Sequence, residues 1–191
     1  KILEALDKTK LFLQDIVKKG VPILVVGTRP SAHLIVRGFA EQFNYPFVIG
    51  RWLGGTLTNF ATLSQRINRF VSLKADRAVG KLEKYTKRER LEIDKELLRM
   101  EQLFGGLEKM KNIPAAILIV DAAAHDTAVR EANRLHIPIL ALCNTDVDPE
   151  KIQHIIPCNA GAKSTIDWIF KKLEEAVSAV RSQAQIQIVP A

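Results

Sequence analysis

Short apolar runs alternate with amphipathic segments over most of the chain. The apolar runs have the length of buried strands, and they cover residues 21–26, 46–49, 115–120, 137–142 and 154–157. Apolar residues at helical spacing fill the segments around them, at 1–19, 32–43, 126–135 and 162–181. Strands that alternate with helices predict a parallel sheet with helices on both faces, and therefore an α/β fold.

The segment 56–110 interrupts this alternation with a different period. Apolar residues recur there three and four positions apart in two stretches, a spacing typical of coiled-coil seams. The stretches are joined by residues 74–86, which are basic and poor in strand formers, and Thr86 with Glu89 offers a capping box for the second helix. We therefore predict a protruding antiparallel coiled-coil hairpin with the seam residues Phe60, Leu63, Ile67, Phe70, Ile93, Leu97, Met100, Phe104 and Leu107.

These two patterns divide the chain into two parts. We expect an α/β domain made of residues 1–55 and 111–191, and an inserted coiled-coil hairpin at 56–110. A chain of 191 residues suits one full-sized domain with an insertion. Because Lys1 already lies inside an amphipathic pattern and no initiator methionine precedes it, we also expect the natural protein to extend further at this end.

The net charge of +7 is concentrated in one stretch. Between residues 51 and 90 there are ten basic and three acidic residues, an excess of seven, and the other 18 basic and 18 acidic residues cancel. A basic segment on a neutral body is typical of a polyanion-binding surface, because each phosphate contact releases condensed counterions. Basic runs are also often only solvated faces, so charge alone leaves both interpretations open.

Membrane and metal chemistry have little basis in this sequence. No apolar run approaches the roughly 18 to 20 residues that cross a bilayer, so we expect no membrane partner. Cys143 and Cys158 form no paired motif, and the four histidines lack the spacing of metal ligands. We therefore expect no metal and no cofactor.

The strongest argument for an enzyme lies in the turn at 27–31. This turn follows a predicted strand and precedes a helix, where doubly wound folds bind ligands, and Arg29 would contact a phosphorylated ligand. Asp121, Asp126, Asp146 and Asp148 follow later strands, where carboxylates can hold magnesium. However, the glycine-rich phosphate motifs are absent, and the same residues suit turns and helix caps. We assign no catalytic residue, and a sugar-phosphate or nucleotide-binding enzyme of α/β fold is the alternative.

The segment 51–60 has an unusual composition. Its sequence is RWLGGTLTNF, in which Arg51 and Trp52 precede a Gly-Gly turn and three small polar residues. Arginine pairs with phosphate, and an indole stacks on a base or sugar. Alternatively, Trp52 anchors the core and Thr56 caps the following helix. The physical argument leaves the two interpretations equal.

This decapeptide resembles the signature of the bacterial-type S-two family of small-subunit ribosomal proteins. Further blocks resemble the same family in the same order, at 81–89, 103–107, 128–133, 137–139 and 144–149. The resemblance covers nearly the whole chain. It departs from the family pattern at 156–160 and at 122–124, where alanine or cysteine replaces acidic, glycine or polar positions.

The resemblance implies a flavodoxin-like α/β domain with a protruding coiled-coil hairpin. It also implies a structural ribosomal protein that binds small-subunit ribosomal RNA near the junction of head and body. Its other partners would be neighbouring small-subunit ribosomal proteins, including the large S-one protein in bacteria, with no small-molecule substrate. The implied location is the ribosome, in a bacterial cytoplasm, a mitochondrion or a plastid.

We therefore predict an RNA-binding surface on the hairpin and its base. Basic side chains would contact phosphates, namely Arg51, Arg66, Arg69, Lys74, Arg77, Lys81, Lys84, Lys87 and Arg88. Shape-dependent contacts with sugars or bases would come from Trp52, Thr56, Thr58 and Asn59. A third interpretation is a protein-interaction module whose coiled coil binds another helix.

Overall fold

The computed structural model describes residues 2–186, apart from the side chains of residues 83 and 184–186. Its sheet is entirely parallel, and the strand order is β2-β1-β3-β4-β5. This is the flavodoxin-like order, so the predicted α/β fold is confirmed. The strands are β1 (Ile23–Val26), β2 (Phe47–Val48), β3 (Ala116–Val120), β4 (Ile139–Cys143) and β5 (His154–Pro157).

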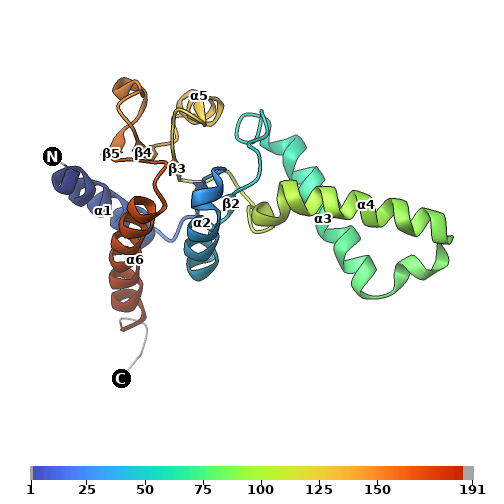
Figure 1. Cartoon of the computed structure of the whole chain (residues 1–191). Helices are drawn as coiled ribbons and strands as arrows, with labels where there is room; N and C mark the ends of the chain where they lie inside the picture. Colours follow the sequence, from blue (N-terminus) through green and yellow to red (C-terminus); the bar gives the residue numbers. More distant parts are fainter. Residues whose placement is uncertain (1, 187–191) are drawn as a thin grey trace.

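Helices cover both faces of the sheet and extend beyond it (Figure 1). The α-helices are α1 (Ile2–Lys18), α2 (Pro30–Phe43), α3 (Phe60–Ala78), α4 (Lys87–Phe104), α5 (Asp126–Arg134) and α6 (Lys163–Ile186). Three short 3-10 turns connect them to their neighbours, namely η1 (Lys81–Lys84), η2 (Gly105–Leu107) and η3 (Pro149–Lys151). Residues 1 and 187–191, which the sequence assigns to the α/β domain, lie outside the described residues.

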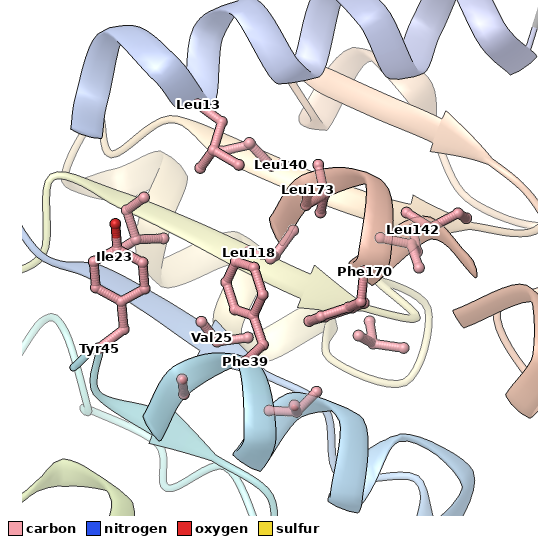
Figure 2. Close-up of a cluster of buried hydrophobic side chains, with 14 of the residues drawn as sticks. Leu13, Ile23, Val25, Phe39, Tyr45, Leu118, Leu140, Leu142, Phe170 and Leu173 are labelled. Carbon is pink, nitrogen blue, oxygen red and sulfur yellow. The ribbon is translucent and has the colours of Figure 1, made fainter. Parts of the chain in front are cut away.

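Alternate strand residues face two separate apolar clusters. Val25, Leu118 and Leu140 pack with α1, α2 and α6 on one face, where Leu13, Phe39 and Phe170 close the cluster (Figure 2). Val26, Ile119 and Ala141 face the second cluster, which contains α5 and the bases of α3 and α4. Since both faces are buried, the strands are continuous apolar runs, which is why they stand out in the sequence.

Helices α3 and α4 form a pair that projects from the sheet, and the chain reverses between them (Figure 1). The predicted seam residues are buried or partly buried in the second cluster, together with the sheet. Their burial agrees with the helical period, while the coiled-coil geometry and the division at residues 56 and 110 stay predictions. The capping box is confirmed, because the Thr86 hydroxyl accepts from the Glu89 N–H and the Glu89 carboxylate accepts from the Thr86 N–H.

Three local expectations differ from the structure, of which the simplest is that α6 ends at Ile186 and not at residue 181. Helix α3 continues to Ala78, so the connection between the helices is shorter than 74–86. Helix α5 begins at Asp126 with His125 at the N-cap, and the Asp126 carboxylate pairs with Arg130 2.9 Å away instead of capping the helix. An aspartate in the first turn is favourable in either role, so the sequence pattern does not separate them.

Gly106 lets η2 pack directly on the edge strand β2. A β-carbon at this position would overlap the carbonyl oxygen and the ring of Phe47. We expect Gly106→Ala to lower the free energy of unfolding by about 1–3 kcal/mol, because the strand edge must move. Urea denaturation measures this, with Gly38→Ala in α2 as the control. An added methyl at Gly38 meets nothing within 4 Å, so this control should gain about 0.5–1 kcal/mol. An unchanged urea midpoint for Gly106→Ala would contradict the close approach of η2 to β2.

Candidate nucleic-acid interface

One buried carboxylate holds the loop between β2 and α3. Glu131 of α5 is 7% exposed, although it belongs to a charged residue type that is seldom buried. Its Oε1 accepts hydrogen bonds from the Trp52 indole N–H at 3.1 Å and the Gly55 N–H at 2.8 Å. Its Oε2 accepts from the Leu57 N–H at 2.9 Å and from the N–H and hydroxyl of Thr58, both at 3.2 Å. The loop is therefore fixed to α5 at several points.

These hydrogen bonds decide the charge state of Glu131. Burial acts to raise the pKa of the Glu131 carboxyl, but the backbone donors of the loop and the Trp52 indole outweigh it, so the pKa is lowered. Gly55 adopts φ +87°, which a side chain would disfavour, and this turn brings its N–H to the carboxylate. Glu131 stays ionised at neutral pH and acts as the centre of the loop.

The loop residues predicted to contact RNA take different positions. Arg51 and Asn59 are exposed, Trp52 is partly buried, and Thr58 is exposed with its hydroxyl bound to Glu131. Thr56 is 2% exposed, and its hydroxyl donates to the carbonyl of Leu53. Trp52 and Thr56 therefore have structural roles, although Thr56 does not cap α3, whose N-cap is Asn59. Arg51 and Asn59 remain open to a partner, and RNA contact by this loop stays a prediction.

Five of the predicted cations on the helix pair are held by acidic neighbours. Arg69 pairs with Glu96 at 3.0 Å, and Arg77 pairs with Asp94 at 3.3 Å, so α3 is linked to α4. The other pairs are Lys74 with Glu101 and Glu108, Lys81 with Asp76, and Arg88 with Glu92. The acids of α4 thus compensate part of the charge, and residues 51–110 carry 13 basic and 8 acidic residues.

The remaining predicted cations have no ion pair among the described residues. They are Arg51, Arg66, Lys84 and Lys87. Sequence reasoning missed Lys95 and Arg99, which are equally exposed and unpaired in the same part of the chain. Lys95 and Arg99 lie four positions apart on the side of α4 opposite the buried Leu97, while Lys87 begins the same helix and lies toward its flank. Helical spacing measured from the buried seam could have found them.

A network of side chains fills the end of the sheet where the strand order reverses, between β1 and β3. Arg29 pairs with the Oδ2 of Asp121, a fully buried carboxylate whose Oδ2 has no hydrogen-bond partner among the described residues besides this ion pair. The His125 Nδ1 lies 2.7 Å from the Asp121 carbonyl, and its Nε2 lies 3.0 Å from the Thr28 hydroxyl. Burial lowers the pKa of His125, which favours a neutral ring that donates from Nδ1 and accepts at Nε2. The turn at 27–31 therefore commits its arginine, whose side chain is 45% exposed, to a buried carboxylate.

Asp126 and Asp148, which were also considered for chemistry, are committed to local partners. Asp148 caps η3 by accepting the Glu150 N–H and pairs with Lys151. Within residues 2–186, no group of three or more histidine, cysteine or acidic side chains is placed to hold a metal ion. Burial raises the pKa of Cys143 and of Cys158 to about 11, so both are protonated thiols at neutral pH. Over the same range, no helix is long and apolar enough to cross a membrane.

Together these features define an α/β scaffold with a projecting, partly compensated basic helix pair. Comparison with known proteins agrees with this class. The family model described as "Ribosomal protein S2" matches residues 1–179, and the chain belongs to this family. It is therefore a structural ribosomal protein and not an enzyme, as the resemblance implied.

Three bacterial relatives illustrate the similarity. The small ribosomal subunit protein uS2 of Thermus thermophilus is 40% identical over 181 residues, which cover 95% of this chain and 71% of the relative. The protein of the same name from Roseiflexus castenholzii is 37% identical over 97% of this chain and 70% of its own length. The Ureaplasma urealyticum protein is 37% identical over 93% of this chain and 51% of its own length.

Glu131→Gln tests the carboxylate that fixes the loop. An amide offers one acceptor oxygen and turns its NH₂ group toward bound donors, so we expect about 2–3 kcal/mol lower free energy of unfolding at pH 7. Folding lowers the pKa of Glu131, so the ionised carboxylate stabilises the folded state fully at pH values above its unfolded-state pKa. This stabilisation is lost as the pH falls below about 4.5. Urea denaturation from pH 7 to pH 3 should show the difference from wild type shrinking. The exposed Glu150→Gln is the control, and equal destabilisation of both variants would contradict the role of Glu131.

Proposed function

We propose that this chain is a structural component of the small ribosomal subunit, where it binds small-subunit ribosomal RNA near the junction of head and body. The α/β body is a rigid support, and the helix pair with its basal loop forms the RNA-binding surface. Family membership supports the ribosomal role, and the implied position comes from the family resemblance. The observation that favours RNA as the main partner is the set of exposed cations on the projecting helices and the adjoining loops that have no ion pair among the described residues.

Paired and unpaired cations have different roles in this proposal. Arg69, Arg77 and Lys74 bind acids of α4 or of the segment after it, so they orient the two helices relative to each other. The Glu108 carboxylate is the largest cause of a raised pKa for Lys74, which keeps that ammonium charged. Unpaired cations can bind phosphates without first breaking an internal ion pair. We therefore assign direct phosphate binding to Arg51, Arg66, Lys84 and Lys87, and add Lys95 and Arg99.

The loop at 51–59 supplies the shape-dependent part of the interface. Arg51 and Asn59 are exposed at its two ends, and Glu131 fixes the backbone between them. RNA is recognised largely by its shape, its 2′-hydroxyls and its unstacked bases, which favours a rigid loop over a mobile one. Trp52, Thr56 and Thr58 hold this conformation, and Trp52 and Thr58 also lie near enough to the surface to touch a sugar or base.

Neighbouring ribosomal proteins are the second class of partner in this proposal. Leu91 and Leu98 of α4 are 61% and 62% exposed, seven residues apart on one face of the helix. Such apolar residues on an otherwise charged helix favour an interaction with protein. In a bacterium, the large S-one protein is a further partner implied by the family.

A salt titration tests the binding of phosphates by the unpaired cations. We expect the combined replacement of Arg51, Arg66, Lys84 and Lys87 by glutamine to reduce the slope of log affinity against log salt by about 0.7–0.9 for each phosphate that is no longer neutralised. The measurement is filter binding to small-subunit ribosomal RNA at several salt concentrations. The matched control replaces four exposed cations of the α/β body that have no ion pair among the described residues, namely Lys8, Lys19, Arg134 and Lys163.

Both four-site variants have the same net charge, so a general effect of charge would lower both slopes equally. The proposal requires the larger reduction in the helix-pair variant. Equal slopes for wild type and the helix-pair variant would show that these four side chains do not bind RNA phosphates.

Sedimentation tests the ribosomal role independently of any residue. In a sucrose gradient of native lysate, we expect the chain to migrate with the small subunit and to shift when magnesium depletion disrupts ribosomes. Immunodetection across the gradient measures this. Recovery only among free proteins, with intact small subunits in the same gradient, would overturn the proposed function.

A further inference from the structure

A cavity of about 430 Å³ lies beside the 51–59 loop, at the carboxyl ends of β1, β2 and β3. This is the side of the sheet, next to its switch point, where open α/β folds bind ligands. Its volume falls in the range of roughly 300–1,000 Å³ that is typical of small-molecule sites. The walls come from the turn after β1, the loop after β2 and the start of α5, and they include Thr28, Arg51, Trp52, His125 and Thr127.

The lining favours an anionic, partly aromatic ligand. It includes the guanidinium of Arg51, which has no ion pair among the described residues, and no carboxylate, so a divalent cation has no charged ligand in the cavity. Trp52 contributes an aromatic ring whose N–H is fixed by Glu131, so the ring keeps one orientation. An arginine can bind a phosphate, and an indole can stack on a base.

The polar groups of the cavity are also suited to a nucleotide. The Thr28 hydroxyl donates to His125, so its lone pairs are left to accept from an exocyclic amine of a base. The Thr127 hydroxyl has no partner within the described part of the chain and can either donate or accept. His125 is held on both ring nitrogens, and it therefore forms a fixed wall instead of a free ligand.

We propose that this cavity receives one unstacked nucleotide, with its phosphate on Arg51 and its base against Trp52. This site differs from the turn at 27–31, whose Arg29 is bound to Asp121. The RNA source of the nucleotide rests on the proposed function: a base extruded from ribosomal RNA would enter the cavity while the helix pair binds phosphates. The same chemistry fits a free mononucleotide, and the experiment separates the two sources.

The test compares an RNA hairpin carrying a single-nucleotide bulge with the same hairpin without the bulge. We expect the full chain to bind the bulged hairpin at least about tenfold more tightly, and Arg51→Gln and Thr127→Val to reduce this ratio. Arg134→Gln, at the far end of α5, is the charge-matched control and should keep the ratio. The Trp52 indole N–H resonance reports occupancy of the cavity, and a parallel titration uses AMP and UMP alone.

The outcomes separate this proposal from the proposed function. Equal affinity for the two hairpins, with no mononucleotide effect on the Trp52 resonance, would overturn the nucleotide site and leave phosphate binding by the helix pair intact. Binding of AMP or UMP that depends on Arg51 without any preference for the bulge would support the site with a free nucleotide as its source. Failure to bind either hairpin would instead overturn the proposed RNA role. The mononucleotide titration alone would then show whether the cavity binds a nucleotide.

Discussion

The carboxylate of Glu131 is the interaction on which the candidate interface depends. It joins α5 to the loop after β2 and satisfies backbone donors that would otherwise be buried without partners. The same loop leads directly into α3, so this ionised group adds to the apolar cluster and to the packing of η2 on β2 in attaching the base of the projecting helix pair to the sheet. Arg51 and Asn59 stand at the ends of this fixed segment, which gives both side chains a defined position relative to the helices.

Electrostatics divides the basic surface into two parts. Acids on α4 and in the segment after it meet cations on α3, and these pairs are exposed, so each contributes little to stability by itself. Their effect is to orient the helices and to reduce the charge that would repel within the pair. The cations that have no acidic partner among the described residues lie on the outer surface, where a polyanion can approach them without competition from the protein's own carboxylates.

The sheet follows the doubly wound pattern, but its ligand-binding end is used differently from that of a nucleotide enzyme. Arg29 and Asp121 neutralise each other at the switch point, while His125 and Thr28 complete the network. In the turn that most resembled a phosphate site, the arginine is therefore paired with a carboxylate of the protein itself. An open cavity remains beside it, lined by the loop that Glu131 fixes, and there Arg51 has no ion pair with any described residue.

The sequence by itself determined the strands, most helix bounds, the capping box and the family. The strands are continuous apolar runs because they are buried on both faces, and Thr86 and Glu89 are close in sequence, so local patterns suffice. Only the tertiary structure decided which charges are free. Glu131 accepts a hydrogen bond from the Gly55 N–H, which lies 76 positions away in the chain. Arg29, which follows β1, pairs with Asp121, which follows the neighbouring strand β3. Such long-range pairs leave no periodic pattern in the sequence, because the partner of a buried charge is set by which residues the fold places next to it.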